Sequence, residues 1–185
     1  MVKQTENNKK PAGRLYSLIL AGIFTAVTAI CSWINIPLPF TAVPINLALL
    51  GVHLSGSLLG PRYGFYSQLI YILLGAIGVP VFAGFSGGFG IIAGPTGGFI
   101  VGYAICALIV GALTKKSAAV SRLALSMILG VIVCYGFGLI WFLILTGTSL
   151  WAGLIACVFP FLPGDGIKSF LAVLLTRRLK PVIRI

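Results

Sequence analysis

The stretch Pro163-Gly164-Asp165-Gly166-Ile167-Lys168 contains the only acidic residue after Glu6, inside a segment otherwise suited to lipid. If the segment is helical as far as Arg177, Asp165 lies about 18 Å from that polar edge, within a hydrocarbon core of roughly 30 Å. A carboxylate at that depth is costly unless it is paired, and Lys168 follows at i+3 on the same helical face. The two residues form either a structural ion pair between helices or a polar anchor for a small ligand. Because ionisable groups inside membranes are mostly functional, we favour the anchor.

The amino-acid composition indicates that most of the chain is surrounded by lipid. The chain is 59% hydrophobic and 8% charged, which predicts an integral membrane protein. A net charge of +11 could indicate nucleic-acid binding. The Lys and Arg residues lie between the apolar runs and do not form a basic face with interleaved aromatic residues. We therefore exclude a nucleic-acid partner.

The apolar runs predict an all-α fold with six transmembrane helices in a single domain, residues 15–180. A basic N-terminal segment, residues 1–14, precedes this domain, and a short tail, residues 181–185, follows it. The predicted spans cover approximately residues 15–34, 44–59, 63–79, 95–113 and 123–145, with a last, broken span ending near Leu179.

The distribution of Lys and Arg predicts the orientation of these spans. With the N-terminus in the cytoplasm, the second–third, fourth–fifth and C-terminal connections are also cytoplasmic. Together with the N-terminal segment they contain every cation except Lys168. The three opposite connections contain none. Both termini are therefore predicted to be cytoplasmic. The first span is too long for the apolar part of a typical signal peptide and has no convincing cleavage site.

The predicted outer connections are rich in Gly, Pro and aromatic residues. The longest runs from Val79 to Gly98 and includes the loop 82–94. Uncharged apolar loops are unsuited to water, so we expect them to fold back and line or cover a cavity; merely tight turns are the alternative. The glycines of the loop 82–94 predict a lid that is mobile when empty, with Phe82 or Phe85 against a ligand.

No motif indicates catalysis. Gly88-x-Gly90-x-x-Ala93 matches a relaxed dinucleotide fingerprint but has no βαβ context. The four cysteines are scattered singly, which predicts neither a metal site nor a redox pair. His53, the only histidine, is interpreted as a packed or backbone-bonded residue. Without a nucleotide-binding motif the chain cannot hydrolyse ATP itself, and we predict that it is not an enzyme.

The first span carries small residues every four positions: Ser17, Ala21, Thr25 and Ala29, with Gly22 and Ala26 beside them. Such a stripe allows another helix to approach closely. Internal packing and docking to a separate membrane subunit explain it about equally well. We choose docking through Ala21, Thr25 and Ala29, because a small protein with a pocket and no energy source needs a partner.

Three patches together resemble the BioY family, the biotin-specific substrate-capture (S) components of energy-coupling factor (ECF) vitamin transporters. They are 41–47 (TAVPINL), 75–99 (GAIGVPVFAG continuing to GPTGGF) and 163–168 (PGDGIK). The first patch departs from the family pattern: Asn46 and Ala48 stand where Thr and Gln are usual. Position 48 therefore has no side chain able to form a hydrogen bond.

The resemblance implies an S-component fold with six helices and an outward-facing biotin pocket in the plasma membrane of a prokaryote. It also implies docking to a transmembrane coupling subunit driven by two ATPases, which alone use ATP; no cofactor is expected beyond biotin as ligand. The expected biotin-binding residues are Asp165, Lys168, Phe82, Gly84, Phe85, Gly88, Thr96, Gly97, Val43 and Asn46. A carboxylate and an ammonium together suit the two N–H donors and one carbonyl of the biotin ureido ring.

Two other functions are considered. A channel or facilitator would have Asp165 and Lys168 lining a continuous pore, and it predicts polar residues along several spans. A structural membrane subunit would use the ion pair and the stripe only for assembly, and it leaves the Gly- and Pro-rich outer connections unexplained.

Overall fold

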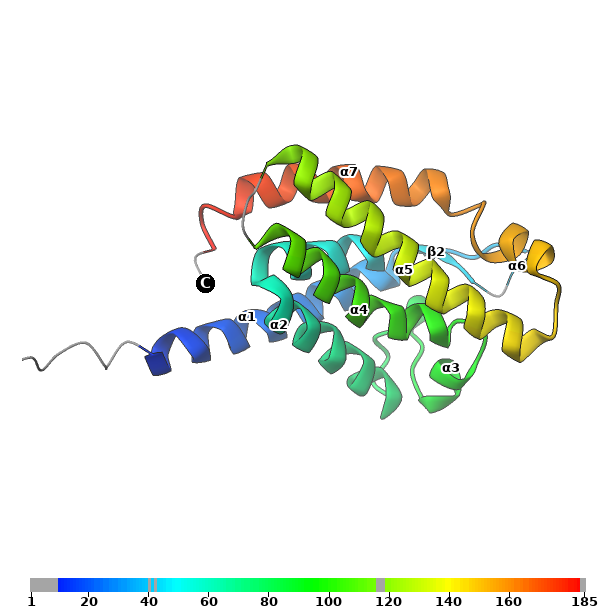
Figure 1. The fold of residues 1–185 in the computed structure, drawn as a ribbon. Helices are drawn as coiled ribbons and strands as arrows, with labels where there is room; N and C mark the ends of the chain where they lie inside the picture. The colour runs from blue at the N-terminus through cyan, green and yellow to red at the C-terminus, as the bar shows by residue number, and fades with distance from the viewer. Residues whose placement is uncertain (1–9, 40, 42, 116–118, 184–185) are drawn as a thin grey trace, which may run out of the picture.

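The computed structural model describes residues 10–39, 41, 43–115 and 119–183, which form a mainly helical domain (Figure 1). The all-α membrane class is confirmed, with one antiparallel pair of two-residue strands added. The elements are α1 (Lys10–Trp33), β1 (Asn35–Ile36), β2 (Ile45–Asn46), α2 (Ala48–Ala76), η1 (Ala83–Phe85), α3 (Phe89–Ala93), α4 (Gly97–Thr114), α5 (Val120–Thr146), α6 (Leu150–Cys157) and α7 (Leu162–Leu179).

The predicted spans correspond approximately to these helices. Within the described ranges, α1, α4 and α5 are each long and apolar enough to cross a membrane. Helices α6 and α7, bent by 51°, are together long and apolar enough to count as a fourth if the pair is one broken span. The second and third predicted spans are joined in α2. The second begins at Ala48, later than predicted, because Ile45–Asn46 pairs with Asn35–Ile36 as a strand.

Helix α2 reverses direction at Gly60, where the backbone adopts φ 76° and ψ −178° directly before Pro61. A Cβ on Gly64 would lie 2.8 Å from the Cα of Gly56, and Gln68 Nε2 donates to Ser55 Oγ at 2.9 Å. Residues eight apart in a straight helix are separated by about 12 Å. The two limbs, 48–59 and 61–76, therefore lie side by side and antiparallel, which accommodates the two predicted spans.

Helix α4 lies in the middle of the bundle, against both α2 and α5. Glycines permit this close packing. A Cβ on Gly56 would lie 2.5 Å from the Ala107 carbonyl oxygen, and one on Gly98 would lie 2.3 Å from Trp141 Cβ. Small residues at such crossings let helix backbones approach closely where no hydrophobic effect drives association.

The small-residue stripe of α1 is internal. The side chain of Ala21 is 0% exposed and packs with Leu54 and Leu58 of α2, and Thr25 Oγ1 donates to the Ser67 carbonyl at 2.8 Å. Ala29 is buried in a cluster with residues including Tyr71. The predicted docking surface of Ala21, Thr25 and Ala29 is therefore wrong, because α2 of the same chain already covers it.

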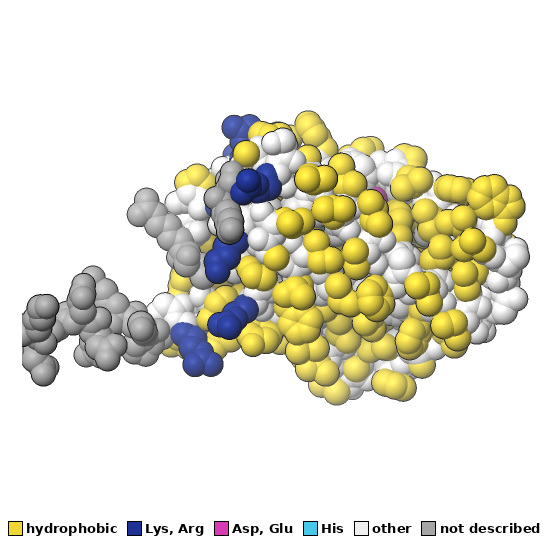
Figure 2. Space-filling model, in the orientation of Figure 1, with side chains coloured by type: hydrophobic (Ala, Val, Ile, Leu, Met, Phe, Trp, Pro, Cys, Tyr) yellow, Lys and Arg dark blue, Asp and Glu magenta, His cyan; other side chains and the backbone are white. Residues whose placement is uncertain are grey.

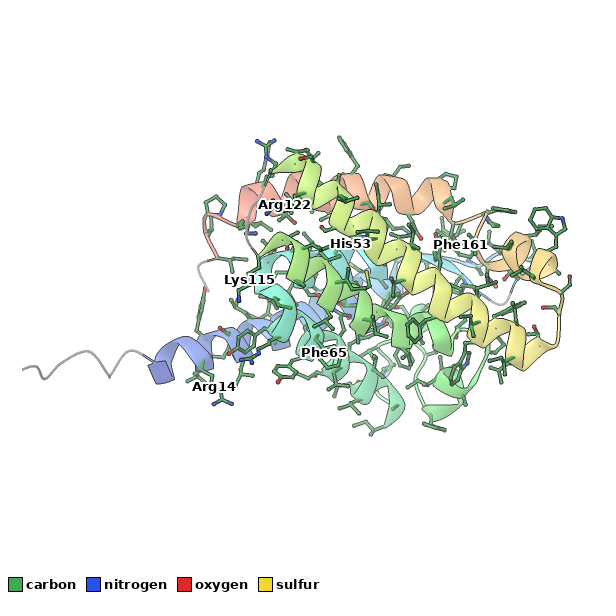
Figure 3. All side chains as sticks on the ribbon, viewed as in Figure 1. Arg14, His53, Phe65, Lys115, Arg122 and Phe161 are labelled. Carbon is green, nitrogen blue, oxygen red and sulfur yellow. The ribbon has the colours of Figure 1, made fainter. Side chains whose placement is uncertain are left out.

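Positive side chains gather at one end of the molecule (Figure 2). Arg14, Lys115 and Arg122 lie at this end, whereas Phe161 lies at the other (Figure 3). Lys180 Nζ donates to the Thr114 carbonyl at the C-terminus of α4, at 2.9 Å, and burial lowers the pKa of Lys180. The side chains between the two ends are mainly apolar on the visible face, as expected for a surface in contact with lipid.

Candidate ligand-binding cavity

A cavity of about 240 Å³ lies among the helices, with the Asp165–Lys168 pair in its lining. Its other residues come from the end of α1, the segment 43–49, α2, the segment 82–96 and all helices from α4 to α7. The volume is close to the lower end of the range for small-molecule sites. Segments far apart in the sequence therefore converge on a site of ligand size.

The polar centre of the cavity is formed by Asp165, Lys168 and Tyr135. Lys168 Nζ donates to Asp165 Oδ1 at 2.5 Å, and the Tyr135 hydroxyl donates to Asp165 Oδ2. The residues Asp165 and Lys168 are 7% and 4% exposed. Asp165 lies in the first turn of α7, where the helix dipole favours negative charge. Helix α7 continues past Arg177, so the distance of about 18 Å between Asp165 and this polar edge, which assumed a helix, holds.

Four further predicted residues line the cavity: Val43, Asn46, Phe82 and Thr96. Asn46 Oδ1 accepts a hydrogen bond from the Ala48 backbone N–H at 3.0 Å. This bond fixes the Asn46 amide at the entrance to α2. Although position 48 lacks a polar side chain, the segment thus contributes a polar group to the cavity through Asn46.

The other four predicted residues do not line the cavity. The Phe85 side chain is 64% exposed and stacks on Trp33, with ring centroids 4.9 Å apart. Gly84 and Gly88 have φ of 68° and 107°, so they supply left-handed backbone to the loop. A Cβ on Gly97 would lie 1.7 Å from the Ile92 carbonyl oxygen. These three glycines therefore shape the wall of the site without contributing to its lining.

Three tyrosines and most of the apolar side chains that line the cavity were not predicted from the sequence. Tyr71, Tyr103 and Tyr135 lie within long apolar runs, where no spacing distinguishes them from core residues. One signal could have identified them as candidates. A tyrosine in the middle of a span needs a partner for its hydroxyl, and Tyr71 donates to Ser32 Oγ while Tyr135 donates to Asp165.

His53 is fully buried, as predicted, but its partners are side chains. Nε2 lies 3.3 Å from Ser169 Oγ and Nδ1 lies 3.9 Å from Cys106 Sγ. His53 is not among the lining residues. Across the described ranges no three His, Cys, Asp or Glu side chains are grouped so as to hold a metal ion. The histidine therefore belongs to the packing behind the site.

The loop 82–94 is anchored at several points in this structure. The backbone N–H of Phe82 donates to the Ser86 carbonyl at 2.9 Å, and that of Gly88 donates to the Gly75 carbonyl at 2.7 Å. The ring of Phe82 is buried against Gly75, where an added Cβ would lie 2.0 Å from it. These contacts favour a fixed wall over the mobile lid that the glycine content predicted.

We therefore expect slow hydrogen exchange at the backbone amides of Phe82 and Gly88, even in the empty protein. Both amides are hydrogen-bonded to carbonyl groups, and exchange requires local opening of those bonds. Exchange measured with and without ligand should differ little at the two positions. Fast exchange that becomes slow only when ligand is bound would instead support a mobile lid.

An apolar helical bundle that spans a membrane and surrounds a cavity with a buried ion pair defines a membrane protein that binds a small molecule. Its sequence matches the model of the BioY family over residues 4–185. The chain belongs to the BioY family.

Two relatives match over nearly their whole length. The biotin transporter BioY of Thermotoga maritima is 37% identical, with 88% of this chain and 95% of that protein covered. The probable biotin transporter BioY of Pyrococcus horikoshii is 38% identical, with 87% and 94% covered. A crystal structure of the S-component for biotin from an ECF-type ABC transporter superposes with a TM-score of 0.85 at 32% identity, covering 96% of this chain and 95% of the other. The S-component fold is thus confirmed.

Proposed function

We propose that this chain captures biotin in the cavity and serves as the biotin-binding subunit of an ECF-type transporter. The observation that carries the proposal is the buried Asp165–Lys168 pair in the lining of a ligand-sized cavity. Relatives named biotin transporter and the likeness to a biotin S-component supply the identity of the ligand.

The chemistry of the cavity suits the biotin ring system. The Lys168 ammonium can donate to the ureido carbonyl, and the Asp165 carboxylate can accept from an adjacent ureido N–H. Phe82, Phe99 and Phe161 provide apolar lining for the fused rings. Because the pair is shielded from water, hydrogen bonds to its charged groups are stronger than they would be at an exposed surface.

Capture fits the structure better than a continuous pore. The polar side chains of α1 and α2 are engaged with one another: Gln68 Nε2 donates to Thr28 Oγ1 at 3.1 Å as well as to Ser55 Oγ. Ser57 is bonded to Thr176 of α7 at 2.7 Å. These hydrogen bonds join neighbouring helices, as in a packed interior, and the side chains that form them do not line a pore. They therefore favour capture over a channel or facilitator.

Coupling to partner subunits requires an exposed docking face, and we place it on the outer side of α1. Gly22 and Ala26 are exposed, and a Cβ added to Gly22 would meet nothing within 4 Å. Ile19, Ile23 and Ile30 are exposed beside them. This face could admit a helix of a transmembrane coupling subunit closely, with ATP hydrolysis left to two ATPases of the complex.

The cationic end supports the predicted orientation, with both termini in the cytoplasm of a prokaryotic cell and the chain in its plasma membrane. A capture subunit needs to bind and release its ligand without altering it. We accordingly propose no enzymatic activity and no cofactor, with biotin as the ligand.

The proposal is tested by growing expressing cells with labelled biotin, purifying the protein in detergent and measuring the retained label. We expect biotin to remain bound in a near-stoichiometric amount, because the ligand is desolvated and held at a buried ion pair. Folded protein that retains no biotin and binds none added later would contradict capture and favour a structural subunit or a facilitator.

A further inference from the structure

We propose that Tyr135 is a positioning residue of the biotin site: its hydroxyl holds the Asp165 carboxylate in the orientation that accepts the ligand. This inference rests on the proposed biotin capture. It concerns a side chain that lies outside the three sequence patches resembling the family.

The two oxygens of Asp165 are held by different helices. Oδ1 is bonded to Lys168, one turn further along α7, and Oδ2 accepts from Tyr135 on α5. Lys168 alone would leave the carboxylate free to rotate about its terminal torsion, which is broad for Asp. A second donor, from another helix, fixes the plane of the carboxylate relative to the cavity.

The Tyr135 ring is itself held in place. It meets Phe99 of α4 edge to face, with centroids 6.4 Å apart and an interplanar angle of 76°. Phe99 also lines the cavity. The ring contact restrains the hydroxyl, which in turn restrains the carboxylate, so α4, α5 and α7 together set the geometry of a single acceptor.

Both bonds leave Asp165 able to bind a ligand. A carboxylate has about four lone-pair sites, of which Lys168 and Tyr135 use two. The remaining sites can accept a ureido N–H while the Tyr135 hydroxyl holds the carboxylate in a fixed orientation.

The other titratable groups near this carboxylate do not replace the tyrosine. Lys168 is the cationic group bonded to it, and Tyr103 of α4 and Cys134 of α5 line the same cavity. Neither Tyr103 nor Cys134 is hydrogen-bonded to Asp165; Cys134 Sγ donates to the Phe99 carbonyl instead. Removing the Tyr135 hydroxyl therefore removes one of the two donors that hold the carboxylate.

The test compares Tyr135→Phe with Tyr66→Phe, a matched change at an exposed tyrosine of α2. Biotin affinity is measured by calorimetry at neutral pH, and thermal unfolding of the empty proteins checks their folding. At neutral pH we expect Tyr135→Phe to bind roughly 10- to 100-fold more weakly and Tyr66→Phe to bind like wild type. Wild-type affinity in a correctly folded Tyr135→Phe variant would overturn the role of Tyr135.

A double mutant separates positioning of Asp165 from mere packing. If Tyr135 acts through Asp165, adding Tyr135→Phe to Asp165→Asn should change the residual affinity little, whereas independent contacts with the ligand would add. Additive losses would overturn the inference. Failure of wild-type protein to bind biotin would instead reject the proposed function.

Discussion

Asp165→Asn is expected to weaken biotin binding by about 30- to 1000-fold, equivalent to about 2–4 kcal/mol. The amide keeps the shape of the side chain but replaces a charge-assisted acceptor with a weaker one. It also leaves the ammonium of Lys168 without its ionic partner in a buried site. Calorimetry with biotin on the purified variant gives the affinity directly.

The Asn variant should still insert into the membrane and fold. Most of the interhelical packing does not involve Asp165, and the amide has nearly the same size and shape as the carboxylate. Yield, detergent-extracted monodispersity and the unfolding temperature provide the check. A folded variant with near-wild-type affinity would remove Asp165 from the binding site.

Ala21→Trp is expected to prevent stable folding. Ala21 is 0% exposed and packed against α2, so an indole ring at this position must displace one helix. Overpacking of a well-packed core typically costs 1–3 kcal/mol, and an indole exceeds the usual enlargement. We expect a large loss of folded protein, measured as yield and unfolding temperature, with biotin binding lost accordingly.

Gly22→Trp is the matched control, one residue along the same helix on its exposed side. Gly22 is exposed and an added Cβ there meets nothing within 4 Å, so folding and biotin binding should be retained. If the outer side of α1 docks to a coupling subunit, uptake in cells that supply this subunit should nevertheless fall strongly. Normal folding of Ala21→Trp would contradict the internal position of the stripe, and normal uptake with Gly22→Trp would exclude the outer face.

The charge pattern made much of the fold predictable. In a bilayer a lone carboxylate is costly wherever it is buried, so Asp165 and its partner Lys168 stand out in an apolar chain. The Lys and Arg groups likewise mark the connections between the spans. The reversal within α2 could be predicted in this way, because Arg62 marks a polar connection directly after Gly60-Pro61.

The surroundings of individual side chains could be predicted less well from the sequence. The spacing of Ala21, Thr25 and Ala29 shows that they share a face, but it does not show which helix covers that face. Gly84 and Gly88 were expected at the ligand, whereas their positive φ shapes the loop. Here the requirement for left-handed backbone and the requirement for close ligand approach select the same residue type.

Tyr135 illustrates the remaining limit. Its role depends on α5 lying against α7, and this is a tertiary contact that no local pattern in an apolar run encodes. By contrast, Asp165 and Lys168 are one helical turn apart, so their pairing could be inferred from sequence alone.

Binding of biotin at the buried ion pair can be seen in a structure of the chain with biotin bound. We expect the ureido ring in the cavity, with its carbonyl oxygen within hydrogen-bond distance of Lys168 Nζ and an N–H directed at Asp165. The ring system should pack against Phe82. Biotin bound outside the cavity, or bound in reverse with its carboxylate at Lys168 and its ureido ring away from Asp165, would show that the ion pair does not bind the ureido ring.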